Sequence, residues 1–127
     1  MLRSESIAAL ADALSKAQGS MTFAKKDSSN PFFKSRYADL AAVVEAIRKP
    51  LADNGLCYTQ TTDIEEGGVT SVIVETTLMH KSGEWVSGRL RMTPIKNDPQ
   101  GIGSCITYAR RYALQSMVGI PADDDDG

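Results

Sequence analysis

The sequence predicts an α+β fold, in which a three-stranded antiparallel β-meander packs with helices and is preceded by two amphipathic helices. Three observations support this prediction. Apolar residues recur at helical spacing over residues 4–19 and 40–54, and polar and apolar residues alternate over residues 56–92, where turn signals interrupt them. A third helical pattern follows from residue 99. A chain of 127 residues is long enough for one domain with a modest core.

The first helix is expected to begin after Ser4, which would serve as its N-cap, and to end around Gly19. Its apolar residues are Ile7, Leu10, Ala11 and Leu14. Residues 23–37 show no period and contain the turn signal Asn30-Pro31, so they are predicted to form an ordered loop.

The second helix has the clearest apolar pattern of the chain. Its apolar residues are Leu40, Val43, Val44, Ile47 and Leu51. Asn54-Gly55 supplies a C-terminal stop signal, and Pro50 is expected to kink or shorten the last turn, because proline lacks the N–H that the helix needs.

Three strands are predicted to follow, over residues 56–62, 69–80 and 85–92, with turns at residues 63–68 and 81–84. In the second strand Val72, Val74 and Leu78 alternate with polar residues, which suits a sheet with one covered face. In the third strand Val86, Leu90 and Met92 share one face. The opposite face carries Trp85, Ser87, Arg89 and Arg91.

The last helix is predicted over residues 99–117, with Asp98 as its N-cap and Pro99 at its first position. Gly101 and Gly103 let backbone or a ligand approach closely, and a helix start attracts anions. At 100° per residue, one stripe of this helix is apolar and is assigned to the core: Ile102, Ile106, Ala109, Ala113 and Met117, with Cys105 and Leu114 at its margins. The opposite stripe is polar and contains Gln100, Ser104, Thr107, Arg111 and Gln115.

The net charge of −2 conceals segregated blocks of charge. Residues 25–50 hold six basic and three acidic groups (+3), residues 51–84 one and six (−5), and residues 85–122 five and one (+4), while residues 123–126 add −4. Phosphate binding depends on a local basic surface and not on the total charge. Nucleic acid is therefore not excluded, and the two basic blocks are expected to converge on one surface.

Several kinds of site are not indicated. Cys57 and Cys105 lack metal-ligand spacing and are interpreted as reduced core residues, and His80 has no companion. The Gly101 and Gly103 pair lacks a parallel βαβ unit, so no nucleotide cofactor is expected. No metal is expected either, because residues 123–126 lack liganding partners. With no membrane span or export signal, a cytoplasmic location is predicted.

Three segments carry a resemblance to a known family. They are residues 31–40 (PFFKSRYADL), residues 80–84 (HKSGE) and residues 98–114, which run from Asp-Pro-Gln to Arg-Arg-Tyr-Ala-Leu. They resemble the signatures of the essential recombination function (Erf) family, the single-strand annealing proteins of phages and prophages. The resemblance covers roughly residues 5–126.

The resemblance implies a β-β-β-α annealing core, assembled as rings or filaments that hold single-stranded DNA in a basic groove during recombination and repair. The core is expected to span residues 1–122, followed by an acidic tail at 123–127. Family members usually continue into a C-terminal segment proposed to contact the host single-strand-binding protein. That segment is expected to be missing here. The expected partners are single-stranded DNA, the annealed duplex and further copies of the chain, in the cytoplasm of a bacterial host.

Annealing needs no covalent step, so no enzymatic catalysis is expected. The predicted DNA-binding residues are Lys34, Arg36, Tyr37, Arg89, Arg91, Lys96, Gln100, Ser104, Thr107, Tyr108 and Arg111. Lys25, Lys26 and Arg110 are secondary, and an intramolecular or intersubunit partner for Arg110 stays open. Two other functions also stay open: an oligomeric nucleic-acid-binding scaffold without annealing activity, and a metal-dependent nuclease.

Overall fold

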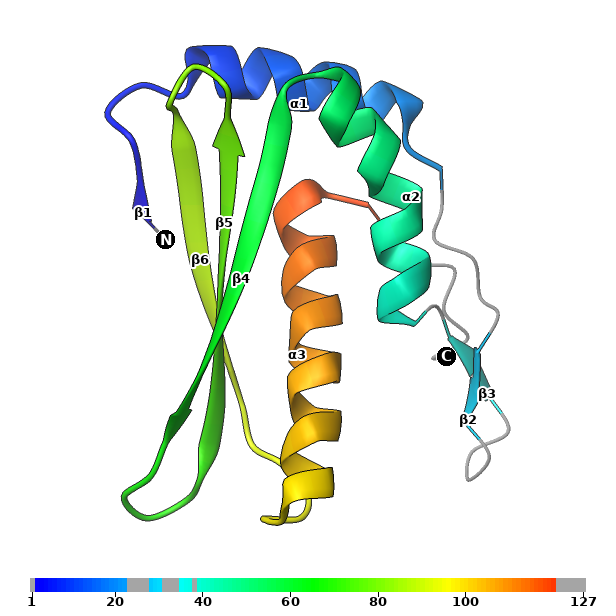
Figure 1. The fold of residues 1–127 in the computed structure, drawn as a ribbon, viewed down its shortest axis with the longest axis vertical. Coiled ribbons are helices and arrows are strands. Elements are labelled where there is room, and N and C mark those ends of the chain that lie inside the picture. The colour runs from blue at the N-terminus through cyan, green and yellow to red at the C-terminus, as the bar shows by residue number, and fades with distance from the viewer. Residues whose placement is uncertain (1, 23–27, 31–34, 38, 121–127) are drawn as a thin grey trace.

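The computed structural model describes residues 2–22, 28–30, 35–37 and 39–120. The elements are, in order, β1 (Leu2–Arg3), α1 (Ala8–Ser20), β2 (Ser28–Asn30), β3 (Ser35–Tyr37), α2 (Leu40–Asp53), β4 (Leu56–Glu65), β5 (Ser71–His80), β6 (Trp85–Met92) and α3 (Pro99–Val118). The predicted α+β class is confirmed (Figure 1). The predicted acidic tail and the basic residues Lys25, Lys26 and Lys34 lie outside the described residues.

The main sheet has the strand order β1-β6-β5-β4, and all neighbouring strands are antiparallel. The three predicted strands are present, whereas β1 was not predicted, because two residues are too few to show alternation. β4 is longer than predicted. It continues through Asp63 and Glu65, which lie opposite Ile73 and Ser71 of β5, where the sequence indicated a turn. Pairing with β5 keeps these charged residues extended while their side chains remain exposed.

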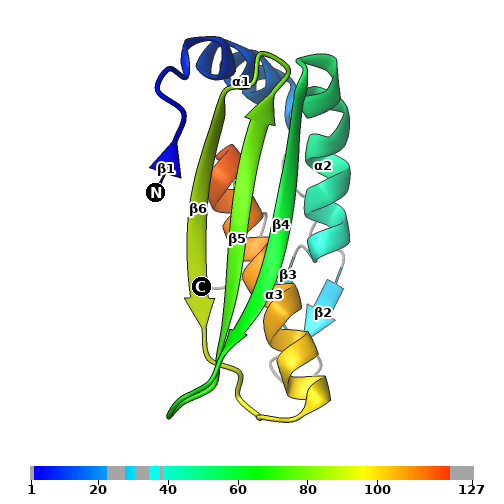
Figure 2. The ribbon, with the colours of Figure 1, turned by 60° about the vertical axis from the view of Figure 1, so that its left-hand side comes forward.

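The helices gather on one side of the sheet. α3 lies along one face of the sheet, α2 lies beside α3, and α1 crosses the end of the sheet where the β5–β6 turn lies (Figures 1 and 2). We call the face toward α3 the inner face; it carries Val72, Val74 and Leu78 of β5, which are all fully buried, as their alternation predicted. We call the opposite face, with Ile73, Glu75 and Thr77 of β5, the outer face. No helix within the described ranges covers it.

The core consists of two clusters on the inner side. The larger cluster joins α1, α2 and the C-terminal part of α3, and includes Leu10, Ile47, Leu78 and Leu114. The smaller cluster joins the other half of α3 to the sheet through Val72, Val74, Cys105 and Ala109. α3 is therefore held both by the sheet and by α2, and this double packing decides which of its polar residues reach solvent.

The start of α1 differs from the prediction. Ile7 is the N-cap residue and gives no side-chain hydrogen bond. Ser4 instead joins β6: its Oγ accepts a hydrogen bond from the Trp85 N–H at 3.0 Å. The carboxylate of Glu84, 74 residues away in the chain, accepts from the Leu10 N–H at 2.8 Å and so satisfies a free donor in the first turn of α1. A cap supplied from so far away has no local sequence signal.

Two further predictions need correction. α2 continues through Pro50 to Asp53, and its Asn54 side chain donates to the Pro50 carbonyl at 2.8 Å. Pro50 stands in the last turn, so few helical residues follow it. The helix still ends close to the predicted stop. The region predicted as a loop contains β2 and β3, which pair with each other as a separate two-stranded sheet.

Candidate nucleic-acid interface

The start of α3 is built as the sequence predicted. Asp98 is the N-cap, its Oδ1 accepts from the Gly101 N–H at 2.7 Å, and Pro99 occupies the first turn. The carboxylate of Asp98 already supplies negative charge where free N–H groups and the helix dipole attract it. The first turn of α3 therefore binds this chain's own anion, and a phosphate is better placed further along the helix.

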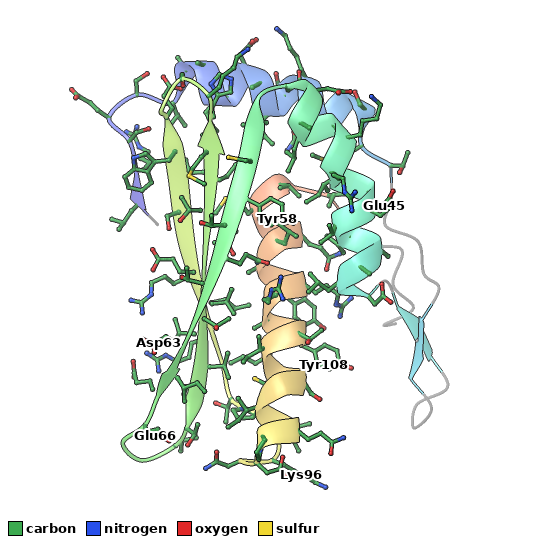
Figure 3. The ribbon with its side chains drawn as sticks, viewed as in Figure 1. Glu45, Tyr58, Asp63, Glu66, Lys96 and Tyr108 are labelled. Carbon is green, nitrogen blue, oxygen red and sulfur yellow. The ribbon has the colours of Figure 1, made fainter. Side chains whose placement is uncertain are left out.

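Gly101 lets the chain's own backbone approach closely. A Cβ on this residue would clash with the carbonyl oxygen of Lys96 and would lie 2.9 Å from its carbonyl carbon. Gly103 is different, since a Cβ there would meet nothing within 4 Å. Gly101 thus fixes the 93–98 loop against the helix and sets the position of Lys96, which is exposed just before the start of α3 (Figure 3).

Two adjoining pockets lie along α3. The first, which we call the Lys96 pocket, has a volume of about 490 Å³ and is mostly apolar; it is lined by Met92, Thr93, Pro94, Ile95, Lys96, Asp98, Gln100, Gly101, Ser104, Cys105 and Tyr108. The second, the Arg111 pocket, has about 270 Å³ and is lined by Asp39, Leu40, Ser104, Thr107, Tyr108 and Arg111. Ser104 and Tyr108 line both, so the pockets form one continuous surface.

This surface brings together six of the predicted DNA-binding residues. They are Lys96, Gln100, Ser104, Thr107, Tyr108 and Arg111. All but Arg111 are exposed, and Tyr108 keeps 37% of its surface accessible. The loop before α3 presents an ammonium group, and one face of the helix continues the surface with an amide, two hydroxyls and an aromatic ring. Such groups can contact phosphate oxygens and stack on a base.

Arg111, which was predicted in the polar stripe that binds DNA, is buried, with only 4% of its surface exposed. Its guanidinium lies 4.5 Å from the centroid of the Tyr112 ring and 5.8 Å from that of Tyr108, within cation–π range. The N-terminal end of α2 covers this level of α3, since Asp39 and Leu40 line the same pocket. A helical wheel contains no information about a neighbouring helix.

The buried side of α3 is also shifted around the helix relative to the predicted core stripe. Ala109 is fully buried, but Ile102, Ile106, Ala113 and Met117 are only partly buried. The buried positions include the predicted margins and their neighbour: Cys105, Leu114 and Val118. The buried arc widens because α3 contacts the sheet along one side and α2 along another.

Arg89 and Arg91 do not belong to this surface. Both lie on the outer face of β6, as the alternation predicted, and the sheet separates them from the pockets. Arg91 forms a bidentate ion pair with Glu65 of β4, at 2.8 and 3.2 Å. Hydrogen bonding and charge attraction from Arg91 lower the pKa of Glu65. The basic groups of residues 85–122 are therefore divided between the α3 side and the outer face, where Arg89 and Arg91 face a mixed surface with Asp63, Glu65 and Glu75. The side chains that carry most of the other basic block, those of Lys25, Lys26, Lys34 and Arg36, lie outside what the structure describes.

Arg110 has an intramolecular partner, which was one of its two open assignments. Its Nε donates a long hydrogen bond to Gln60 Oε1 at 3.5 Å, while Gln60 Nε2 donates to the Arg110 carbonyl and to Thr76 Oγ1, both at 3.0 Å. Gln60 thus ties α3 to the inner face of the sheet. The other predicted residues, Arg36 and Tyr37, stand in β3, where their backbone pairs with Ser29 and Ser28.

The cysteines divide into two kinds. Cys105 is buried at the Lys96 pocket, as predicted, and burial raises the pKa of its thiol. Cys57 is exposed on the outer face, so its assignment to the core is wrong. The pocket residues that the sequence analysis missed are Asp39, Leu40 and the 93–95 segment. Asp39 carries a detectable signal, because it stands before an apolar helical run and accepts from the Ala42 N–H at 2.8 Å as the α2 N-cap.

In the part of the chain that the structure describes, no three His, Cys, Asp or Glu residues cluster as a metal site. None of the described helices has the length and apolarity required to cross a membrane. Comparison with curated proteins and with solved structures gives no match. The family model of the ERF superfamily matches residues 10–127, which is nearly the whole chain and includes both pockets. The chain therefore belongs to the ERF superfamily.

Proposed function

We propose that this protein binds single-stranded DNA along the two pockets of α3 and anneals complementary strands as an oligomer. Membership of the ERF superfamily implies a phage recombination protein of the annealing type. The observation that carries the proposal is the continuous surface on which Ser104 and Tyr108 join the Lys96 pocket to the Arg111 pocket. Residues 1–122 would form the binding unit.

The chemistry of this surface suits a strand held by its backbone. Two complementary strands repel each other through their phosphates, so an annealing protein has to neutralise that charge while base edges remain free to pair. Lys96 supplies charge at one end of the surface, and the hydroxyl of Ser104 supplies a neutral hydrogen-bond donor where the pockets adjoin. The hydroxyl of Thr107 donates to the Gly103 carbonyl at 3.2 Å, so its oxygen remains as an acceptor. Tyr108 offers a ring face for sequence-independent stacking.

The DNA surface is tested by removing a single charge from it. Lys96→Gln should lower the salt dependence of single-strand binding by about 0.7 in the slope of log K against log salt, which is about fivefold in affinity at 0.1 M salt. Lys81→Gln is the matched control, because Lys81 is exposed in the turn that follows β5, whereas Lys96 follows β6 at the opposite end of the sheet. Equal slopes for both variants would place the DNA elsewhere.

Arg111→Ala is a poor test of the DNA surface. Because the side chain is buried between α2 and α3, its removal would disturb packing as well as charge. Tyr108→Ala compared with Tyr108→Phe is sharper: the phenylalanine keeps a ring for stacking and should retain most of the affinity, whereas alanine should lose it. Similar losses in both variants would assign Tyr108 to hydrogen bonding instead.

The annealing step is tested by mixing complementary labelled strands with the full chain at low salt. Faster duplex formation than in buffer alone supports annealing. Binding without acceleration would leave the second candidate, a nucleic-acid-binding scaffold, which the same exposed surface favours. Metal-dependent shortening of the strands in the same reaction would identify a nuclease and refute the proposal that catalysis is absent.

A further inference from the structure

The two edges of the main sheet are open at the same level. β1 pairs with Ser87 and Val86 only. Within the described residues, the edge of β6 that points away from β5 therefore has no partner strand from Gly88 to Met92 (Figure 2). At the other edge, β4 is partly covered near α2, whereas Thr61–Glu65 are all exposed. The register across β5 places Gln60 level with Gly88 and Ile64 level with Met92. We call Gly88–Met92 of β6 and Thr61–Glu65 of β4 the open halves of the two edges, and they lie at the same level of the sheet.

The outer face gives these edges opposite charges. β6 carries Arg89 and Arg91 there, and β4 carries Asp63 and Glu65. Figure 3 shows Asp63 on the side of the sheet away from α3. Asp63 and Arg91 occupy the same level across β5, two strand spacings apart, which is about 9.6 Å. Neither open half contains proline, so both can pair with another strand.

We propose that β4 of a second copy adds to β6, so that the sheet continues from one copy into the next. β4 and β6 are both antiparallel to β5, so a sideways shift of the molecule pairs them in parallel. This arrangement places Asp63 of the added copy about 4.8 Å from Arg91, one strand spacing away. Pairing β6 with β6 would oppose arginines and pairing β4 with β4 would oppose carboxylates, which is unfavourable.

An interface between two different edges leaves one open edge at each end, so it repeats until a ring closes or a filament grows. A groove beside β6 also supports this interface. It has a volume of about 290 Å³ and is lined by Thr76, Gly88, Arg89, Leu90, Tyr112, Ala113, Ser116 and Met117. Tyr112 is 44% exposed there and can cover side chains of the added strand. This inference deepens the proposed function and rests on its oligomer.

Charge reversal on each edge tests the interface. Arg89→Glu with Arg91→Glu makes both edges acidic, and Asp63→Arg with Glu65→Arg makes both edges basic. Each variant alone should sediment as a single copy in the absence of DNA, and an equimolar mixture should regain the wild-type assembly by alternating the two. Both variants lose the internal pair of Arg91 with Glu65, so its loss cannot explain recovery on mixing. The proposal would be overturned if either variant assembled alone, if the folded mixture stayed monomeric, or if the wild type were a monomer.

A second measurement does not depend on charge reversal. In a Cys57→Ser background, Arg91→Cys with Asp63→Cys places two thiols two strands apart within one copy, beyond the Cα separation of about 4.4–6.8 Å that a disulfide needs. Across the proposed interface the same residues are neighbours. Oxidation should give a ladder of linked copies, whereas each single-cysteine variant should give none. Absence of the ladder refutes the interface, while assembly without single-strand binding would refute the proposed function alone.

Discussion

Two glycines of α3, two residues apart, should respond to alanine with opposite signs. At Gly101 a Cβ clashes with the Lys96 carbonyl oxygen, and because the obstacle is backbone, the 93–98 loop must move. Overpacking of this kind costs about 1–3 kcal/mol. At Gly103 the space is open, and replacing glycine inside a helix stabilises it by about 0.5–1 kcal/mol. The difference between the two variants therefore isolates the clash, because the gain in helix propensity is shared.

The assay is urea unfolding followed by circular dichroism at one fixed protein concentration, with equal slopes required before the free energies are compared. Gly101→Ala should be less stable than Gly103→Ala by about 1–3 kcal/mol. Because the shifted loop carries Lys96, Gly101→Ala should also weaken single-strand binding, and Gly103→Ala should not. Equal stability of the two variants would show that the loop yields without cost and would refute the close approach as the reason for glycine at 101.

Three further predictions concern packing and titration. Leu114→Ala should lower the free energy of unfolding by about 2–5 kcal/mol in the same urea assay, since Leu114 is fully buried; a loss below 1 kcal/mol would contradict its place in the core. Carbon-detected NMR should find the pKa of Glu65 below its ordinary value and returning toward it in Arg91→Gln, so the ion pair stabilises the fold above the unfolded pKa and loses its effect as pH falls through the lowered value. At pH 8 an aromatic disulfide reagent should modify exposed Cys57 quickly and Cys105 slowly, because burial raises the pKa of Cys105; equal rates would contradict this.

Local signals in the sequence predicted most of the fold. Alternation located β5 and β6, and Asp98 with Pro99 located the start of α3, because each signal lies within a few residues of the structure that it specifies. The misplaced features depend on distant residues. Glu84 supplies the missing cap of α1, and β5 holds the end of β4 extended beyond the predicted turn.

The candidate site was predicted where one helix face contains it and missed where several elements combine. Gln100, Ser104 and Thr107 are exposed on one side of α3, as the helical period implied. Arg111 has the same period but is buried, because α2 covers it. Arg89 was grouped with the helix by charge, although the alternation in β6 already placed it on the strand face opposite the apolar residues that α3 covers.

The short connection between β6 and α3 links the two proposed surfaces energetically. Met92 is the last residue of the β6 edge and also lines the Lys96 pocket, and only residues 93–98 separate β6 from α3. If strand addition at Met92 favours the arrangement of the Lys96 pocket that binds DNA, assembly and DNA binding are coupled. Affinity would then depend on protein concentration, and by thermodynamic reciprocity single-stranded DNA would promote assembly by the same factor.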